Sequence, residues 1–262
     1  MKRRGGSRGL WVFDFDGTLS PLVPDRNAAQ LHPASRALLK DLAGCPGNRV
    51  AVLSSRSIED LASRVPVPNL FLSGGSGLEW RLPAGHRIRP GEEAERKLEE
   101  ARGPVLRSLA RVSSFPGVEL EDKRWSVAVH FRSVPPEALS ALSPLLRDLK
   151  TFPGIRVFEG PAVAEVLFLP SASKLFGIRR FCDFLRFDPS GGRIFYAGDD
   201  ENDAEAMGWV VSMKGTAIAV GNRVRITGVR SVDGPLGLAR AVRAMADSDR
   251  TKRTAAERRA RD

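Results

Sequence analysis

The stretch LWVFDFDGT, residues 10–18, places Asp14 and Asp16 directly after a short apolar run. An uninterrupted run of this kind is typical of a strand that is buried on both faces of a parallel sheet. Gly17 allows the tight turn that must follow the strand. Because α/β proteins build their sites at the carboxyl ends of such strands, this stretch indicates both the fold and the position of a site.

Similar apolar runs recur at residues 49–53, 69–72, 193–197 and 216–220. Two helix-like segments follow the first two apolar runs, one at residues 33–42 and the other at 57–65. Ser57 is the expected N-cap of the second helix. This alternation predicts an α/β fold with a doubly wound parallel sheet of the Rossmann-like kind.

The middle of the chain, residues of about 90–170, follows a different order of helix, strand, strand, helix, strand, strand. Within it, the pair Gly103-Pro104 is expected to break the helical segment 91–112. The pattern predicts a small α+β unit inserted into the core, called the cap below. The expected domains are a first core part at 10–88, the cap at 89–170, a second core part at 171–246 and a basic tail at 247–262.

Charge and cysteine content limit the function classes. Lys and Arg number 41 against 31 Asp and Glu, which gives a net charge of +10, and both ends of the chain are rich in basic residues. This leaves a polyanion-binding protein as one alternative, but no basic patch interleaved with aromatic residues supports it, so we expect no nucleic-acid partner. No uncharged apolar run approaches the roughly 18 residues of a membrane span, so no membrane partner is expected. Cys45 and Cys182 match no zinc-ligand spacing and favour a reduced, cytoplasmic setting.

A second acidic cluster, DDEND at residues 199–203, again follows an apolar run. Taken alone, either cluster could be an Asp-rich turn that caps a helix. Two clusters at strand ends of one sheet instead indicate a cation site, because unpaired carboxylates repel one another and Mg²⁺ prefers oxygen ligands.

Four segments, in this order, resemble the motifs of the haloacid dehalogenase superfamily: DFDGT at 14–18, Ser54, Lys174, and GDDxxD at 198–203. Four others narrow the resemblance to the trehalose-6-phosphate phosphatase family, namely LSPL at 19–22, VLSSR at 52–56, GVELEDK at 117–123 and HFR at 130–132. The resemblance covers about residues 10–242 and includes the cap. It implies a hydrolase core with a mobile cap.

The chemistry that the resemblance implies agrees with the residue types. Asp14 is the expected nucleophile, which forms an aspartyl-phosphate, and Asp16 the expected acid and base for the leaving sugar oxygen and the attacking water. Ser54 and Lys174 are expected to hold phosphoryl oxygens. With Asp14 and Asp16, they form the predicted catalytic set.

Mg²⁺ is the expected cofactor, with Asp14, Asp16 through its backbone carbonyl, and Asp199 as ligands. The residues expected to support these ligands are Asp200, Asn202 and Asp203.

The cap is expected to choose the substrate, because sugar hydroxyls need well-placed carboxylates, amines and imidazoles. The predicted substrate-binding residues are Arg56, Glu121, Lys123, His130, Arg132 and Glu165. Of these, Glu165, Glu121 and Lys123 resemble the sugar contacts of the family. On a half-exposed sheet, the same residues could instead face solvent.

Two segments depart from the family pattern. Ser76 in the GGSG turn stands where the family commonly has a histidine, and the stretch from Glu165 to Lys174 lacks the usual basic residue and the glycine after the lysine. The expected function is Mg²⁺-dependent hydrolysis of trehalose 6-phosphate to trehalose and phosphate. The alternatives are a phosphatase for another glycosyl or disaccharide phosphate and a phosphomutase. We expect a small-molecule sugar phosphate as substrate and a monomeric protein.

Overall fold

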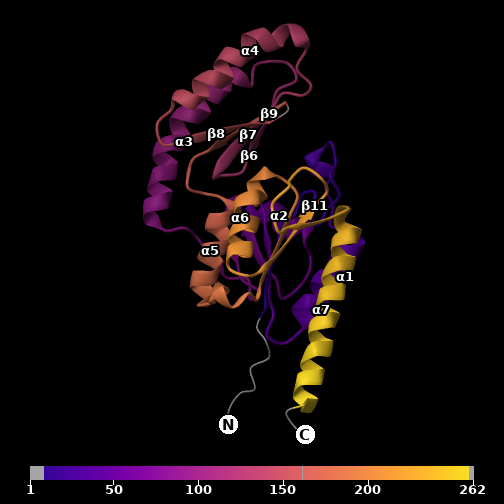
Figure 1. Cartoon of the computed structure of the whole chain (residues 1–262). Helices are drawn as coiled ribbons and strands as arrows, with labels where there is room; N and C mark the ends of the chain where they lie inside the picture. Colours follow the sequence, from indigo (N-terminus) through magenta and orange to yellow (C-terminus); the bar gives the residue numbers. More distant parts are fainter. Residues whose placement is uncertain (1–8, 161, 260–262) are drawn as a thin grey trace.

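The computed structural model describes residues 9–160 and 162–259, with side chains as far as residue 246. Figure 1 shows a larger sheet with helices around it and, above it, a smaller sheet covered on its outer side by α3 and α4. The sequence order of these parts is core, cap, core. No helix in the described residues is long and apolar enough to cross a membrane.

Eight strands form the core sheet in the order β12-β11-β10-β1-β2-β3-β4-β5. Their bounds are β1 Leu10–Phe13, β2 Arg49–Leu53, β3 Phe71–Gly74, β4 Glu79–Arg81, β5 Arg87–Ile88, β10 Ile194–Gly198, β11 Thr216–Val220 and β12 Arg230–Val232. The six strands from β12 to β3 are parallel, and β4 and β5 extend the sheet antiparallel. The predicted doubly wound α/β core is confirmed.

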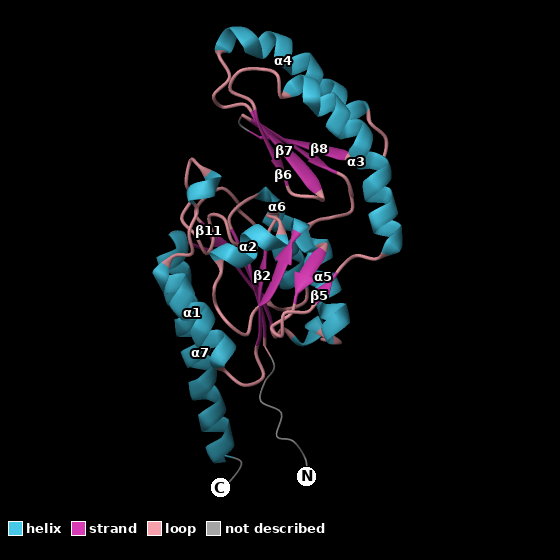
Figure 2. Cartoon of the chain, turned by 180° about the vertical axis from the view of Figure 1, so that it is seen from behind, coloured by secondary structure: helices cyan, strands magenta, loops and turns pink. Residues whose placement is uncertain are grey.

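Helices cover both faces of this sheet, and Figure 2 shows them from behind. Their bounds are α1 Pro33–Gly44, α2 Ile58–Arg64, α5 Lys174–Leu185, α6 Glu201–Ser212 and α7 Gly234–Arg259. Side chains of β1 alternate between the faces: Phe13 packs in the cluster with α1, α2 and α7, whereas Val12 packs with α5 and α6. The predicted N-cap of α2 is confirmed, because the Ser57 hydroxyl accepts a hydrogen bond from the Asp60 N–H at 3.2 Å.

The cap consists of two helices on one side of a four-stranded antiparallel sheet. Its elements are α3 Glu92–Val112, β6 Glu119–Asp122, β7 Ser126–His130, α4 Pro136–Asp148, β8 Arg156–Gly160 and β9 Val163–Leu167, with the sheet order β6-β7-β9-β8. Val127 and Val129 of β7 pack against the helices. The alternate residues of β7, Ser126, Ala128 and His130, therefore lie on the opposite face, which looks toward the core.

The predicted break at Gly103-Pro104 is wrong, because α3 runs through it without interruption. Pro104 removes one backbone hydrogen bond from the helix. Leu98 and Val105, before and after the proline, are both buried in the same hydrophobic cluster. Tertiary packing of the helix face thus outweighs the local cost of the proline.

Both ends of the chain are rich in basic residues. Helix α7 extends through most of the predicted tail, as far as Arg259. Residues 1–8 and 260–262 lie outside the described residues.

Candidate active site

The site lies at the carboxyl ends of three neighbouring parallel strands, β10, β1 and β2. Asp14 follows β1 directly, Asp199 follows β10, and Ser54 follows β2. The connections of β1 and β10 lead to opposite faces of the sheet, which opens a crevice at this edge of α/β folds. The sequence therefore brings these three side chains together through strand order alone.

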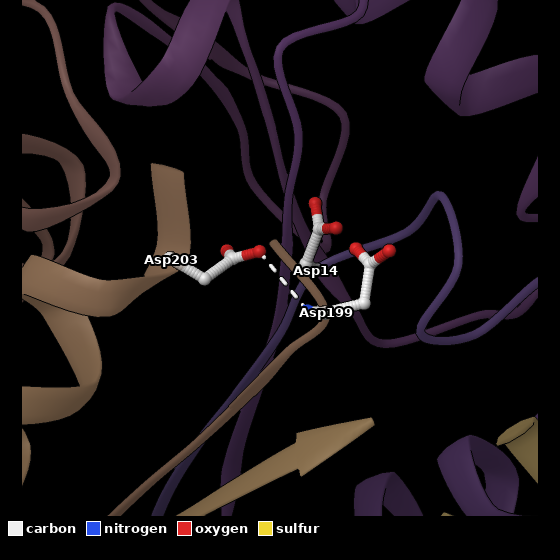
Figure 3. Close-up of side chains that lie close together, drawn as sticks. All are labelled: Asp14, Asp199 and Asp203. Atoms are coloured by element: carbon white, nitrogen blue, oxygen red, sulfur yellow. Dashed lines mark hydrogen bonds between the residues drawn. The ribbon is translucent and has the colours of Figure 1, made fainter. Parts of the chain in front are cut away.

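Three buried carboxylates meet in this crevice, those of Asp14, Asp199 and Asp203, called the acidic triad below. One oxygen of each lies within 4.8 Å of the others, and Figure 3 shows the three side chains. The turn at Gly17 permits this approach: its φ is +73°, and a Cβ at this position would lie 2.1 Å from Asp199 Oδ2. A side chain at residue 17 would therefore displace Asp199.

Lys174, the first residue of α5, supplies a positive charge to the triad. Its Nζ donates to Asp14 Oδ1 and to Asp203 Oδ1, the latter at 3.0 Å. Burial alone lowers the pKa of Lys174, but the carboxylates of Asp14 and Asp203 outweigh it and raise the pKa above its ordinary value. The lysine therefore stays charged in a place where water is excluded.

Asp203 uses both of its oxygens to hold the site together. Its Oδ1 accepts from Lys174 and from the Tyr196 hydroxyl at 2.5 Å. Its Oδ2 accepts from the backbone N–H of Asp199 at 3.1 Å (Figure 3) and from that of Asp200 at 3.3 Å. Burial raises the pKa of Asp203, but Lys174 and these hydrogen bonds lower it below the usual value. Asp203 thus orients the loop and the lysine.

The second acidic cluster is also, in part, an Asp-rich turn that caps a helix. Asp200 is the N-cap of α6, where its carboxylate accepts from the Asn202 N–H at 2.9 Å and forms a capping box with Asp203. The Asn202 side chain is exposed and contacts Asp200 at 3.4 Å. One turn therefore both starts a helix and directs Asp199 into the crevice.

The two remaining carboxylates, those of Asp14 and Asp199, face each other with few partners. Among the described residues, Asp14 Oδ2 accepts no hydrogen bond, and Arg223 lies 3.5 Å from Asp199 Oδ2. Burial raises the pKa of Asp14 well above its ordinary value, against the charge of Lys174. Burial and then Asp200 raise the pKa of Asp199 to about 7. Two crowded oxygen donors of this kind fit a hard divalent cation, which would relieve their repulsion.

Asp16 lies outside the triad and is held by Arg56. Arg56 is almost completely buried, and its Nε and Nη2 donate to the two oxygens of Asp16 at 2.8 and 2.7 Å. Its Nη1 donates to Asp60 at 2.6 Å. A two-pronged contact of this kind fixes the carboxylate in orientation as well as in place. The guanidinium contacts Asp16 and Asp60, and its predicted role in substrate binding stays a prediction.

Ser54 is buried at the end of β2 beside this pair. Its hydroxyl oxygen accepts from the Arg56 N–H at 3.2 Å, so its own O–H remains able to donate. The carbonyl of Ser54 accepts from the Ser76 N–H at 2.9 Å, which ties the GGSG turn to the strand end.

Four of the five predicted cap residues form one connected group, Glu121, Lys123, His130 and Glu165, called the cap cluster below. Lys123 Nζ donates to Glu165 Oε1 at 2.8 Å and lies 3.7 Å from Glu121, and His130 Nε2 lies 3.2 Å from Glu121. Burial raises the pKa of Glu121, but His130 and Lys123 outweigh it and hold the pKa at about 2. The cap cluster belongs to the sheet face that looks toward the core.

The fifth cap residue, Arg132, is not part of this cluster. Its Nη1 donates across to the core, to the carbonyl of Pro24 at 3.3 Å. A second bond between core and cap was not predicted: Arg26 Nη1 contacts Glu121 Oε2 at 3.3 Å. No sequence signal marks Arg26, because a lone arginine in a Pro- and Asp-rich loop normally points to solvent.

A cavity of about 420 Å³ opens between the cap and the start of α2. Ser57 and Glu59 line it from the core, and Arg102, Asp122 and Lys123 line it from the cap. Lys123 also belongs to the cap cluster, so this cavity adjoins that cluster.

Comparisons with known proteins show which family the chain belongs to. The family model described as Trehalose-phosphatase matches residues 12–234. Trehalose-phosphate phosphatases of Mycobacterium tuberculosis (strain ATCC 25618 / H37Rv) and Mycobacterium marinum are each 34% identical to this chain, over 215 and 212 residues. These matches cover 79% of this chain and 52% and 53% of the relatives. The chain thus spans about half the length of the curated relatives that it matches.

Solved structures with the same fold are more distant in sequence. A trehalose-6-phosphate phosphatase related protein superposes with a TM-score of 0.74 at 19% identity, over 93% of this chain and 99% of that one. The C-terminal domain of Candida albicans trehalose-6-phosphate phosphatase gives 0.66 at 18% identity, over 89% and 90%. These likenesses show the fold, and the family match extends over most of the sequence. The chain belongs to the trehalose-phosphatase family.

Proposed function

We propose that this chain hydrolyses a sugar phosphate, most readily trehalose 6-phosphate, to the free sugar and inorganic phosphate. The observation that carries the proposal is the contact of Lys174 with Asp14 in a buried crevice, with Asp199 beside them and a polar cap face above. A carboxylate, an ammonium and a cation-binding acid at one point are what phosphoryl transfer needs.

Asp14 and Asp16 divide the chemistry. The Asp14 carboxylate attacks phosphorus, the bond from phosphorus to the sugar oxygen breaks, and Asp16 gives its proton to that oxygen. In the second step Asp16 takes a proton from water, the water oxygen attacks phosphorus, and the bond to Asp14 breaks to release phosphate. In this structure Arg56 donates to both oxygens of Asp16, so the proposed role requires the Asp16 carboxylate to turn from Arg56 toward the sugar oxygen.

Lys174 and Ser54 hold the phosphoryl oxygens. The lysine ammonium has three N–H groups, and two of them point to Asp14 and Asp203, which leaves one for a phosphoryl oxygen. The Ser54 hydroxyl supplies a neutral donor from the next strand.

Mg²⁺ is the cofactor that we propose, held by the carboxylates of Asp14 and Asp199 and the backbone carbonyl of Asp16. When bound, it shields Asp14 from the negative charge of the substrate and draws charge from a phosphoryl oxygen. Asp203 supports the site through Lys174 and the backbone of residues 199 and 200, and Asp200 and Asn202 fix the turn.

The cap cluster and Arg132 are proposed to recognise the sugar. Glu121 and Glu165 accept from sugar hydroxyls, while Lys123 and His130 donate to hydroxyl oxygens or orient the two carboxylates. The support for this assignment is the position of the cluster on the core-facing side of the cap sheet.

The test is phosphate release from trehalose 6-phosphate beside a panel of other glycosyl and sugar phosphates. We expect kcat/KM for trehalose 6-phosphate to exceed that for the panel by at least about tenfold, because the cap cluster offers more donors and acceptors than one sugar ring can use. Preference for another disaccharide phosphate would move the proposal to that substrate. Transfer of the phosphoryl group to a second sugar hydroxyl, without release of phosphate, would identify a phosphomutase and contradict the proposal.

Mg²⁺ is expected to stabilise the chain as well as activate it. Because the cation neutralises crowded buried carboxylates, the melting temperature should be several degrees higher in excess Mg²⁺ than in a chelator, as binding to the folded state requires. Differential scanning calorimetry of the wild type and of Asp199→Asn tests this. Equal shifts in both proteins would contradict the proposed ligand.

We also propose the domain limits 10–88, 89–170, 171–246 and 247–262, a monomeric state and a cytoplasmic location. The unpaired thiols of Cys45 and Cys182 support a reducing compartment.

A further inference from the structure

Arg26 is a core residue that reaches the cap from a rigidly held turn. The short helix η1, Arg26–Ala28, presents the side chain, and Nη1 contacts Glu121 Oε2 of the cap at 3.3 Å. The carbonyl of Arg26 accepts from Arg56 Nη2 at 2.7 Å. Arg64 Nη1 donates to the carbonyl of Ala29 at 2.6 Å. The turn is thus clamped on both sides, so little ordering is needed to present its guanidinium.

Two nitrogen atoms of this guanidinium, Nε and Nη2, are shielded from solvent and have no hydrogen-bond partner among the described residues. Their N–H groups lie side by side along one edge of the planar group, which is the geometry that grips two neighbouring oxygens. Buried donors in folded proteins are almost always paired, so a pair of unmatched donors calls for an acceptor. Nη1, which contacts Glu121, does not belong to this edge of the guanidinium.

The charges around Arg26 indicate which kind of acceptor its two unpaired N–H groups can bind. Its positive charge helps to lower the pKa of both Glu121 and Glu165, against the burial that raises them, so it lies near two carboxylates. A phosphate group placed there would be repelled by both acids. Neutral hydroxyl oxygens meet no such repulsion, and they are what the cap cluster is proposed to hold.

We propose that Arg26 is a sugar-binding residue that determines specificity, and that its Nε and Nη2 donate to two neighbouring hydroxyl oxygens of the leaving sugar. This inference rests on the proposed function, because it places the sugar where the η1 turn meets the cap cluster, and it requires the Arg26–Glu121 contact to loosen so that the sugar reaches Nε and Nη2. The residue completes the sugar site from the core side. Its charge also keeps Glu121 ionised as a hydroxyl acceptor.

The experiment compares Arg26→Lys, Arg26→Ala and the control Asn27→Ala in the full chain. Lysine keeps the charge and can pair with Glu121, but it lacks the parallel pair of N–H groups. We expect both Arg26 variants to raise KM for trehalose 6-phosphate and to lower kcat/KM by about 10- to 100-fold, as the loss of charged hydrogen bonds predicts. The exposed neighbour Asn27, on the same turn, should change neither value by more than about twofold.

The inhibition constant of inorganic phosphate, measured in the same assay, tests the site without the sugar. We expect Arg26→Lys to leave it unchanged, because phosphate alone uses only the core residues. If Arg26→Lys behaves like the wild type and only Arg26→Ala is impaired, the arginine is an ionic contact to the cap and the inference is overturned. Equal losses for substrate and for inorganic phosphate would also overturn it, since they indicate a general distortion.

Failure of the proposed function and failure of the role of Arg26 give different experimental results. A wild-type chain that hydrolyses no sugar phosphate would refute the proposed function, whatever the variants do. If the wild type prefers a different sugar phosphate, the comparison is made with that substrate. An active wild type whose Arg26→Lys variant keeps its KM refutes the role of Arg26 alone.

Discussion

Asp14→Asn is expected to lower kcat for sugar-phosphate hydrolysis by on the order of 10⁴ or more, because an amide cannot form the acyl-phosphate intermediate. The fold should survive the change. Lys174 keeps Asp203 as a partner, and the triad loses one of three crowded carboxylates. Phosphate release gives the rate, and far-ultraviolet circular dichroism with a thermal melt gives the fold. We expect a melting temperature equal to or above that of the wild type.

The matched control for this change is Asp183→Asn. Asp183 is an exposed acid on α5 whose side chain makes no hydrogen bond or ion pair with the described residues, and the same substitution there should leave kcat within about twofold. A second measurement tests whether Asp14 is the residue that becomes phosphorylated. Intact-protein mass spectrometry after rapid acid quench should find an added phosphoryl group in the wild type and none in Asp14→Asn. A folded Asp14→Asn protein with substantial turnover would remove Asp14 from the mechanism.

The parallel core was predictable because each of its central strands is buried on both faces. Continuous apolar runs such as residues 50–53 leave few alternatives once helices alternate with them. The strands β4, β5 and β12 were not predicted, since two or three residues contain no period that can be recognised. Trp80 of β4 is nonetheless completely buried and stacks on Phe181 of α5 at 4.4 Å. Packing of that one side chain, rather than local propensity, defines this edge of the sheet.

The proximity of Asp14 and Asp199 could be predicted because the two residues end strands of one parallel sheet, whereas Lys174 was expected beside them from the family resemblance alone. What the strand order leaves open is how the acids divide their tasks. Asp203 joins the triad, whereas Asp16 turns away to Arg56. Both outcomes depend on hydrogen bonds between side chains far apart in the sequence.

The other contacts of the site could not be predicted, because no local sequence pattern marks them. Tyr196 is a strand residue whose hydroxyl contacts Asp203, and the sequence marks it only as apolar core. Arg26 and Glu121 are 95 residues apart and meet only because the cap folds back over the core. The meeting of two separately packed units depends on surface shape, which no periodicity encodes.

Lys174→Met is expected to have the largest effect on stability. Methionine has a similar length but no charge, so Asp14 and Asp203 would be left buried without their counter-charge. Breaking a buried ion pair in this way costs about 3–5 kcal/mol of the free energy of unfolding. For a chain of this size the melting temperature should fall by about 10 °C. The rate of phosphate release should also fall by on the order of 10²-fold or more, because a positive charge at the phosphoryl group is lost.

The double variant Lys174→Met with Asp14→Asn decides whether charge is the cause. If the instability comes from uncompensated acids, removing one acid should restore part of the melting temperature, although activity stays absent. The two changes would then be non-additive in the free energy of unfolding, as expected for groups in direct contact. Lys97→Met is the control, since Lys97 forms only an exposed pair with Glu93 and should shift stability by less than about 0.5 kcal/mol. A double variant no more stable than Lys174→Met would show instead that the lysine acts through packing of its aliphatic chain, and that the acidic triad tolerates its own charge.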